Sequence, residues 1–381
     1  MRALRVIVVG GGIGGMAAAI ALHRRGHDVQ VWERAAAVGE VGSGLTLWPN
    51  GLRALDAIGV GDGVRSRAMA DTEGGIRDRS GRWLTRTDTE KLADRYGPVV
   101  AVRRADLFDI LRTALGEDRL RLGVTVTGVE SLWETTVARV RYSGGAETAD
   151  LVVGADGLRS VVRAAVCPHA RPPRYAGYTA WRMITDPLPD LRQGGQIWGS
   201  GEIFGIVPLA DHRVYMFGAV NAAEGEHAPD GEFAEVRRRF GDWPDPVPRL
   251  LGAVSPDSVM RHDIYHLPDL PTFVRGRVAL LGDAAHAMTP NMGQGANLAL
   301  EDAVTLAALL GHGEIDDALR GYDALRRPRT RALAHRSRRI GTVAQWSWTP
   351  AVRARDTALR LMPGWAMPRA FARALDWTPP A

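Results

Sequence analysis

A glycine-rich turn between two apolar runs is the feature that most constrains the fold. It lies within Arg5 to Arg34, which reads RVIVVGGGIGGMAAAIALHRRGHDVQVWER. The apolar run from Val6 to Val9 predicts a strand, the spacing from Met16 to Leu22 predicts a helix, and a second apolar run ending at Trp32 predicts another strand. Strand, tight turn, helix and strand form the opening unit of a doubly wound α/β sheet.

Three glycines in this turn, Gly10, Gly12 and Gly15, satisfy the pattern G-x-G-x-x-G. Without side chains they allow the turn, the approach of a pyrophosphate to the backbone and close packing of the helix on the sheet. Free N–H groups and the positive end of the helix dipole then face the phosphates. Glu33, about 20 residues further on, is placed to accept a hydrogen bond from a ribose hydroxyl. The residues predicted to hold a dinucleotide here are Gly10, Gly12, Ile13, Gly14, Gly15, Glu33 and Arg34.

Two other interpretations of the segment compete with this one. Met1 to Leu22, with arginines before an apolar stretch, could serve as a secretory signal. The glycine cluster would interrupt the helix of such a signal, however, and Glu33 would be unexplained. The pattern could also be a chance match. A strand before it, a helix after it and an acid at the right distance argue against chance.

Composition excludes several classes of protein. A chain of 381 residues is long enough for two domains, and its apolar content of 45% is that of an ordinary globular protein. Outside the glycine segment no uncharged stretch approaches the roughly 20 residues of a membrane span. Cys167 is the only cysteine, which leaves no disulfide and no cysteine-based metal site. We therefore expect a cytoplasmic protein without membrane insertion or a metal site.

The basic residues do not indicate nucleic-acid binding. The chain has 48 Lys and Arg against 43 Asp and Glu, a formal charge of +5, and every basic residue except Lys91 is an arginine. These arginines are spread along the chain rather than gathered in one basic stretch. One local cluster is either a solvated helix face or a group that steers an anionic cofactor. It consists of Arg326, Arg327, Arg329, Arg331, Arg336, Arg338 and Arg339.

The middle of the chain predicts a second sheet. Asp71 to Thr87 predicts a hairpin that turns at Ser80 and Gly81, and Glu147 to Val153 predicts a single strand. From Tyr175 to about Val220, strands rich in aromatic residues follow one another. Strand alternation places Tyr178 and Arg182 on one face and Trp181 on the other, while Tyr215 and Phe217 share a face. These strands are typical of a separate antiparallel sheet.

The last strand of the first domain is expected only after this sheet. Val278 to Leu281 predicts a buried strand ending in Gly282-Asp283, and a long helix is predicted from about Leu298 to Leu310. The expected architecture is an α/β Rossmann-type domain of residues 1–70, 98–172 and 276–320. Residues 71–97 and 173–275 form the inserted substrate-binding sheet domain, and residues 321–381 form C-terminal helices.

Three separated motifs now stand together in the sequence. They are Gly10 to Glu33, the pattern Asp156-Gly157-x-x-Ser160-x-x-Arg163, and Gly282-Asp283-Ala284-Ala285-His286 with Pro290 and Gly293-Gln294-Gly295-x-Asn297. In this order they resemble the single-component FAD-dependent aromatic hydroxylases, the family of p-hydroxybenzoate, salicylate and urate hydroxylases. Trp48-Pro49-Asn50-Gly51 and Tyr175-Ala176-Gly177-Tyr178 are similar to the urate hydroxylase and zeaxanthin epoxidase branch. The resemblance covers nearly the whole chain and implies a Rossmann-type FAD-binding domain.

The resemblance also implies roles for individual residues. Asp283 would accept hydrogen bonds from the ribityl hydroxyls, unless it only caps a helix. Arg104 would reach the ribityl-pyrophosphate region, unless it is a surface arginine. The helix that follows Gly293 to Asn297 would direct its N–H groups and about half a positive charge at the N1–C2=O edge of the flavin. The further residues implied to contact the cofactor are Thr46 and Val126 through backbone, Asp156 as a holder of arginines, Pro290, Gln294, Gly295 and Ala296. His286 is interpreted as structural.

The implied activity is monooxygenation. NADH or NADPH would reduce FAD, O2 would form a C4a-hydroperoxyflavin, and one oxygen would pass to an electron-rich ring or double bond, by hydroxylation or epoxidation. No second G-x-G-x-x-G follows a strand, so the nicotinamide nucleotide has no dinucleotide domain of its own. The implied partners are an aromatic small molecule and O2, and the chain is expected to be a monomer or homodimer.

Tyr215 and Arg182 are the candidate catalytic groups of the substrate domain, with Pro290 beside the flavin. Each has a structural alternative, as a tyrosine at a sheet edge or a salt-bridged surface arginine. The strand position where urate hydroxylase presents a substrate-binding arginine holds Ile203, so we expect a largely apolar substrate.

Two alternatives remain. One is a flavin-dependent halogenase, whose lysine and Trp-x-Trp-x-Ile-Pro segment are not matched by Lys91 or Trp346-Ser347-Trp348. The other is an FAD-binding protein without turnover.

Overall fold

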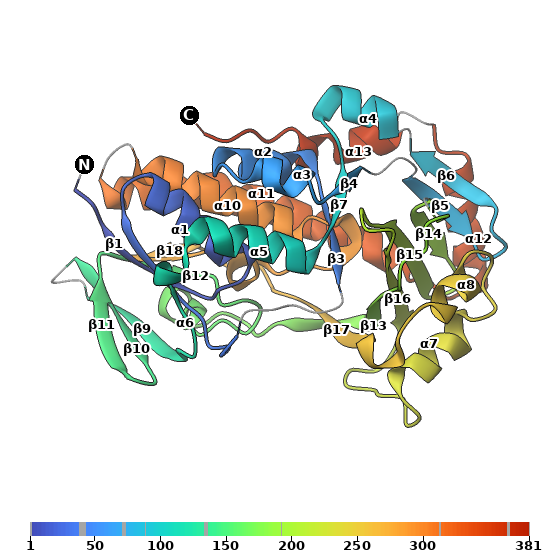
Figure 1. The fold of residues 1–381 in the computed structure, drawn as a ribbon, viewed down its shortest axis with the longest axis horizontal. Helices are drawn as coiled ribbons and strands as arrows, with labels where there is room; N and C mark the ends of the chain where they lie inside the picture. Colours follow the sequence, from blue (N-terminus) through green and yellow to red (C-terminus); the bar gives the residue numbers. More distant parts are fainter. Residues whose placement is uncertain are drawn as a thin grey trace.

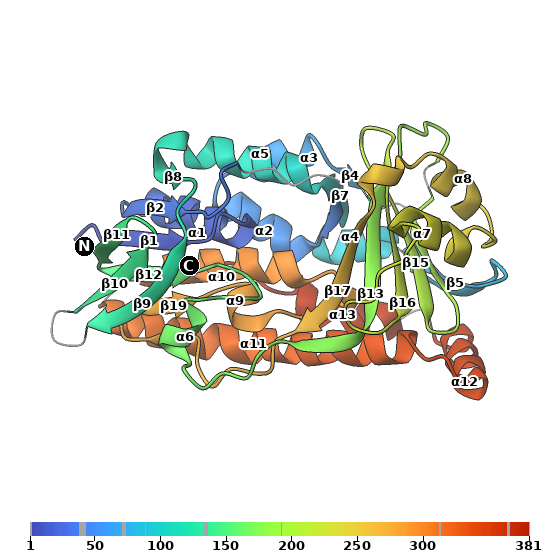
Figure 2. The same cartoon turned by 90° about the horizontal axis from the view of Figure 1, so that it is seen from below.

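Two large sheets stand toward opposite ends of the molecule, and two long helices run along its length (Figure 1). The computed structural model describes residues 2–37, 43–70, 74–87, 89–132, 136–191, 193–311, 314–363 and 366–380. Helix α10 (Gly295–Leu310) packs against α1 (Ile13–Arg24), and α11 (Ile315–Ala344) extends beneath both sheets (Figure 2). Helix α11 therefore connects the two ends of the molecule.

The first large sheet has six strands in the order β18-β19-β12-β1-β2-β8. Its strands are β1 (Arg5–Val9), β2 (Asp28–Trp32), β8 (Leu120–Arg121), β12 (Leu151–Gly154), β18 (Val274–Arg275) and β19 (Val278–Leu280). All neighbours are parallel except β18 and β19. The residues Val6 to Val9 are buried, as expected for a parallel strand covered on both faces. The predicted strand-turn-helix-strand unit is confirmed.

The single strand expected from Glu147 to Val153 is wrong, because the chain changes sheets at Asp150. Residues up to Ala149 form β11 (Gly145–Ala149), which pairs with β10 (Val137–Tyr142). The carboxylate of Asp150 accepts a hydrogen bond from the amide of Arg5 at 2.8 Å, and its own amide donates to the carbonyl of Arg5 at 2.9 Å. These bonds direct the following residues into β12, beside β1.

The second large sheet has seven strands in the order β17-β13-β16-β15-β14-β5-β6. Its strands are β5 (Gly74–Asp78), β6 (Trp83–Thr87), β13 (Arg174–Ile184), β14 (Gly195–Trp198), β15 (Glu202–Pro208), β16 (Val214–Asn221) and β17 (Met260–His266). The predicted hairpin is β5 and β6, although Asp71 to Glu73 lie outside the described residues. It joins the sheet through a parallel pairing of β5 with β14.

The two faces of this sheet have different partners, as strand alternation predicts. Trp181, Phe204 and Met216 form a buried cluster with Val236 and Phe240 of α7 (Glu232–Phe240). The opposite face carries Tyr178, Arg182, Tyr215 and Phe217 in matching register. One face is thus a closed aromatic core, and the other carries the polar residues Arg182 and Tyr215.

The remaining elements complete the layers. The two small sheets are β11-β10-β9, with β9 (Val126–Leu132), and β3-β7-β4, with β3 (Gly44–Leu47), β7 (Val100–Arg103) and β4 (Met69–Ala70). The other helices are α2 (Pro49–Ala57), α3 (Gly61–Arg65), α4 (Thr89–Tyr96), α5 (Arg104–Leu115), α6 (Arg163–Val166), α8 (Val247–Gly252), α9 (Asp283–His286), α12 (Thr349–Arg360) and α13 (Ala366–Leu375). The 3₁₀ turns are η1 (Glu117–Arg119), η2 (Pro256–Ser258) and η3 (Pro290–Met292).

The expected mixed α/β architecture with C-terminal helices is therefore present. The exact domain boundaries stay a prediction. Helix α10 begins at Gly295, three residues before the predicted start, so Gly295 to Asn297 form its first turn rather than a preceding loop. None of the helices in the described ranges is both long and apolar enough to cross a membrane.

The aromatic core on the helix-covered face yields a prediction about stability. Phe240 is fully buried and its ring contacts Trp181, Phe204 and Trp243. Phe240→Ala should lower the free energy of unfolding by about 3–5 kcal/mol, because it leaves a cavity. Urea denaturation measures the loss. Phe233→Ala, at a half-buried position on the same helix, is the control and should cost clearly less; equal losses would contradict this account.

Candidate functional site

Four parallel strands of the six-stranded sheet deliver the sequence motifs to one edge. The strands β19, β12, β1 and β2 are neighbours, and their carboxyl ends meet at the same side of the sheet. Gly10 follows β1, Glu33 follows β2, Asp156 lies two residues after β12, and Asp283 lies three residues after β19. In open α/β sheets this edge, where the strand order reverses, is the place of ligand binding. The fold therefore brings three motifs that are far apart in sequence into one crevice.

The three glycines of the turn have different environments. Gly10 has φ of +108°, and a Cβ there would overlap the backbone of Ala155, while a Cβ on Gly15 would overlap the carbonyl oxygen of Gly10. Gly12, the N-cap of α1, has ordinary backbone angles and nothing within 4 Å of an added Cβ. Gly10 and Gly15 are thus needed for the turn itself, whereas Gly12 leaves open space at the helix N-terminus. No side chain caps α1, and its first turn holds no acidic residue.

The remaining residues of the opening unit surround this space. The carboxylate of Glu33 accepts hydrogen bonds from the amide of Gly11 at 2.7 Å and from the amide of Ala35 at 2.9 Å. It therefore lies directly beside the glycine turn. Arg34 is exposed next to it. Ile13 is buried, and an added Cβ on Gly14 would meet Leu281 and Ala299, so Gly14 permits close packing of α1 on α10.

Among the residues that the structure describes, the carboxylate of Asp156 forms no hydrogen bond or ion pair with an arginine, and its implied role as a holder of arginines stays a prediction. Its carboxylate accepts hydrogen bonds from the Ser160 hydroxyl at 2.6 Å and from the amides of Val161 and Val162 at 2.7 and 3.1 Å. Arg163 donates instead to the carbonyl oxygens of Ala284 and Leu158. Asp156 acts as a cap because these amides lie at the start of a helical turn and need acceptors.

Asp283 differs from the other acids of this edge. It is the first residue of α9 and is exposed. Among the residues that the structure describes, its carboxylate has no hydrogen bond or ion pair. A carboxylate at this position is available to accept hydrogen bonds from a ligand.

The N-terminus of α10 lies against the segment that carries Thr46. The side-chain amide of Asn297 donates to the carbonyl oxygens of Thr46 and Gly293, and its oxygen accepts from the amide of Trp48. No side chain caps this helix, no acid lies in its first turn, and a Cβ on Gly295 would meet nothing within 4 Å. The first amides of the helix, including that of Ala296, thus remain directed at open space. The side chain of Gln294 is buried and accepts from Asn50.

Three further predicted residues lie around this region. Arg104 is the first residue of α5, and its amide donates to the carbonyl of Ser43 at 2.9 Å. Val126 is buried at the start of β9, and Pro290 is exposed at the start of η3. Burial lowers the pKa of His262, and the charges of Arg182 and Arg104 lower it further. Arg182 of β13 and Arg104 at the start of α5 therefore both lie within electrostatic reach of His262.

The open face of the seven-stranded sheet supplies the other wall. The Arg182 guanidinium donates to the Tyr215 hydroxyl at 2.8 Å. Tyr215 packs against Ala101 of β7, and a Cβ on Gly44 would contact its ring, so this face lies against the sheet that carries Thr46. An added Cβ on Gly205 would overlap the ring of Phe217, which therefore lies across β15.

Ile203 and Tyr178 extend this wall toward η3. Ile203 is buried in an apolar cluster that includes Tyr178, Trp198 and Ala219. The Tyr178 hydroxyl donates to the side-chain oxygen of Asn291 at 2.9 Å, next to Pro290. Burial raises the pKa of Tyr178 well above its usual value, so this phenol stays protonated. The wall is thus aromatic and apolar, with the Arg182–Tyr215 pair as its polar point.

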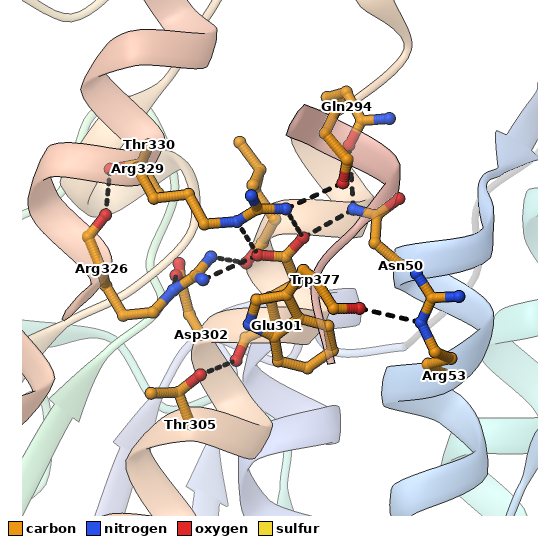
Figure 3. A network of polar contacts seen from close by, with 12 residues as sticks. Asn50, Arg53, Gln294, Glu301, Asp302, Thr305, Arg326, Arg329, Thr330 and Trp377 are labelled. Atoms are coloured by element: carbon orange, nitrogen blue, oxygen red, sulfur yellow. Dashed lines mark hydrogen bonds and ion pairs between the residues drawn. The ribbon is translucent and has the colours of Figure 1, made fainter. Parts of the chain in front are cut away.

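Sequence reasoning missed a buried charge network behind the site (Figure 3). Glu301 and Asp302 on α10 are 0% exposed and Arg326 on α11 is 1% exposed. Arg326 binds both carboxylates at 2.7 Å, and Arg329 binds Glu301. The solvated-face interpretation is therefore wrong for Arg326, although Arg331, Arg338 and Arg339 are exposed. Two adjacent acids in an otherwise apolar helix were the available signal, because buried carboxylates need partners.

Comparisons with known proteins agree with this geometry. The model of the FAD binding domain family matches residues 3–337. The chain is 37% identical to aurachin C monooxygenase/isomerase of Stigmatella aurantiaca over 99% of both chains. It is 36% identical to 3-amino-4-hydroxybenzoate 2-monooxygenase of Streptomyces cremeus, over 94% of this chain and 92% of that protein. It is also similar to the crystal structure of Klebsiella pneumoniae HpxO complexed with FAD and uric acid. That match has 31% identity and a TM-score of 0.90, and covers 98% of this chain and 96% of the other.

The chain belongs to the FAD-dependent monooxygenases that hydroxylate aromatic compounds. Neither of these relatives is named as a halogenase, and that alternative is not favoured. The site fits FAD by its own features: the open space at Gly12, two helix N-termini without side-chain caps, and the exposed Asp283 carboxylate.

The different environments of two glycines generate a paired prediction. Gly15→Ala should lower the stability of the FAD-free protein by about 1–3 kcal/mol, since the new methyl group overlaps the turn. Gly12→Ala should leave that stability nearly unchanged but weaken FAD binding roughly tenfold, because the methyl group occupies the space predicted for the pyrophosphate. Thermal unfolding and titration of flavin fluorescence measure the two effects. Unchanged FAD affinity in Gly12→Ala would contradict the predicted position of the pyrophosphate.

Proposed function

We propose that this protein uses NADH or NADPH and O2 to hydroxylate a largely apolar aromatic small molecule. The balanced reaction consumes the substrate, O2, NAD(P)H and one proton, and forms the hydroxylated product, water and NAD(P)+. The observation that carries the proposal is the apolar wall around the Arg182–Tyr215 pair, with Ile203 buried in it. The cytoplasmic location and the monomeric or homodimeric state stay predictions.

The cofactor residues follow from the open positions at the sheet edge. The N-terminus of α1 would bind the pyrophosphate at Gly12, Glu33 would accept from the ribose of the adenosine, and Asp283 would accept from the ribityl hydroxyls. Glu33 would exchange its present bond to the Gly11 amide for the ribose hydroxyl. Arg104 and the backbone at Thr46 and Val126 complete the binding surface.

Bound FAD supplies the two-electron chemistry that links NAD(P)H to O2. The protein must stabilise negative charge on the reduced ring and keep water out. The amides at the N-terminus of α10 would stabilise that charge, and no acid or side-chain cap competes with it there. Phe217, Tyr215 and Ile203 exclude water from the opposite side. Pro290, at the start of η3, would limit the space beside the ring.

Substrate selection rests on the open face of the sheet. The Arg182 guanidinium donates to the oxygen of Tyr215, which leaves the Tyr215 hydroxyl proton available to a substrate oxygen. Stabilising a phenolate oxygen in this way favours loss of the phenolic proton, and the phenolate ring is richer in electrons than that of the neutral phenol. An isoleucine in place of the arginine that urate hydroxylase presents removes the partner of an anionic substrate. A neutral, flat aromatic compound with one phenolic or enolic oxygen therefore fits best.

Anaerobic reduction tests the activity. NADH or NADPH is mixed with the FAD-loaded protein, with and without a panel of neutral and anionic aromatic compounds, and the flavin absorbance is followed before oxygen is admitted. A neutral phenolic compound should accelerate reduction and then appear as its hydroxylated product. Absence of reduction under every condition would indicate a flavoprotein without this turnover. Product formation from urate would contradict the preference for an apolar substrate.

The Arg182–Tyr215 pair yields a prediction about catalysis. Tyr215→Phe should slow hydroxylation by about 10²-fold, because the phenolic oxygen of the substrate loses the Tyr215 hydroxyl as its hydrogen-bond donor. Flavin reduction should change little. Stopped-flow kinetics separates the two steps. Tyr175→Phe is the matched control, since its hydroxyl bonds only the carbonyl of Ala222. Equal slowing of both steps in Tyr215→Phe would return Tyr215 to a structural role.

A further inference from the structure

We propose that Asp302, held by Arg326, is a positioning residue that clamps the turn carrying Asp283 in the geometry needed to bind FAD. The inference rests on the proposed contact of Asp283 with the cofactor. It concerns buried residues of α10 and α11 that do not reach the crevice themselves.

Asp302 holds both ends of the one-turn helix α9. One carboxylate oxygen, Oδ2, accepts from the amide of Gly282 at 3.0 Å, directly before this helix. The same oxygen lies 2.5 Å from Nε2 of His286, its last residue. Asp283 is the first residue between these two anchors. A shift of the carboxylate would therefore move or release the residue predicted to bind the ribityl chain.

The conformation of the turn needs such an anchor. Gly282 has φ of +57°, and its carbonyl oxygen accepts from the amides of Ala285 and His286, both at 2.9 Å. A helix of four residues has little stability of its own. Its fixed position must come from tertiary contacts, and the side chains of Asp302 and His286 supply them inside the core.

Arg326 holds the other oxygen of the same carboxylate. Its Nε donates to Oδ1 of Asp302 at 2.7 Å, and another guanidinium nitrogen lies 2.7 Å from Glu301. Burial opposes ionisation of Asp302, but the attraction of His286 and Arg326 holds its pKa at about 2. With Arg329 on Glu301, two buried carboxylates face two guanidinium groups. Because the ionised carboxylate of Asp302 can only accept, Nε2 of His286 carries the proton of their hydrogen bond.

Asp302→Asn tests the clamp most directly. The carboxylate accepts on both oxygens, whereas an amide has a single acceptor oxygen and a group with two donors. The amide must therefore confront the N–H of either Gly282 or Arg326. We expect FAD affinity of the apoprotein to fall roughly tenfold, measured by titration of flavin fluorescence.

A double-mutant cycle shows whether the effect passes through Asp283. Asp283→Asn should weaken FAD binding, and adding Asp302→Asn to it should cause little further loss. Independent, multiplied losses would overturn the proposal, as would unchanged affinity in either single variant. Thr305→Val is the control: this buried hydroxyl on α10 bonds only the carbonyl of Glu301, so FAD affinity should not change.

A second pair of variants keeps the test independent of the folding of Asp302→Asn. His286→Gln retains a side-chain N–H for Asp302 and should keep FAD affinity within about threefold, whereas His286→Ala should lose roughly tenfold. Equal FAD affinities of these two variants, with unchanged thermal unfolding of both apoproteins, would overturn the proposal that Asp302 clamps the turn. Failure of the proposed hydroxylation is distinguishable, because FAD could then still bind with this pattern while NAD(P)H and aromatic compounds produced no turnover.

Discussion

The common edge of four parallel strands is the constraint on which the site depends. Because β19, β12, β1 and β2 are neighbours and run in one direction, their following residues must meet at one crevice. The pairing of β12 with β1 is set by the two backbone and side-chain bonds between Asp150 and Arg5, where the chain leaves one sheet for another. A change of one residue in this register would move Asp156 away from the glycine turn.

Buried charge lies behind this edge, and its balance has a structural consequence. Two adjacent carboxylates in an apolar helix would each cost several kcal/mol without partners. Arg326 and Arg329 of α11 remove that cost, so α10 can occupy the core only when α11 is docked against it. Glu301 accepts a hydrogen bond from Asn50, which lies beside the N-terminus of α10, and Asp302 accepts one from the amide of Gly282. One buried network thus reaches both regions predicted to bind the flavin.

The two faces of the seven-stranded sheet have different roles: one stabilises the fold, and the other would select the substrate. The face toward α7 is filled by Trp181, Phe204 and Phe240, and changes there should affect folding. The other face carries the Arg182–Tyr215 pair and Phe217, whose ring is accommodated by Gly205. Substrate preference can therefore change on this face while the core behind it stays intact. The hairpin β5 and β6 comes from a distant part of the sequence and joins this sheet by pairing with β14.

The sequence alone determined the strand-turn-helix-strand unit, the α/β class, the family and the alternation of Tyr178, Arg182 and Trp181. The unit, the class and the alternation depend on local periodicity and on glycine spacing, which neighbouring residues specify, whereas the family rests on the resemblance of three separated motifs. It did not determine the break at Asp150, the capping role of Asp156 or the burial of Arg326 within an arginine-rich helix. Each of those depends on a partner far along the chain or on local backbone geometry: Arg5 for Asp150, the amides after Ser160 for Asp156, and two acids of α10 for Arg326. Only the folded structure decided them: the partners of Asp150 and Arg326 are set by what packs against these residues, and the role of Asp156 is set by the backbone conformation after Ser160.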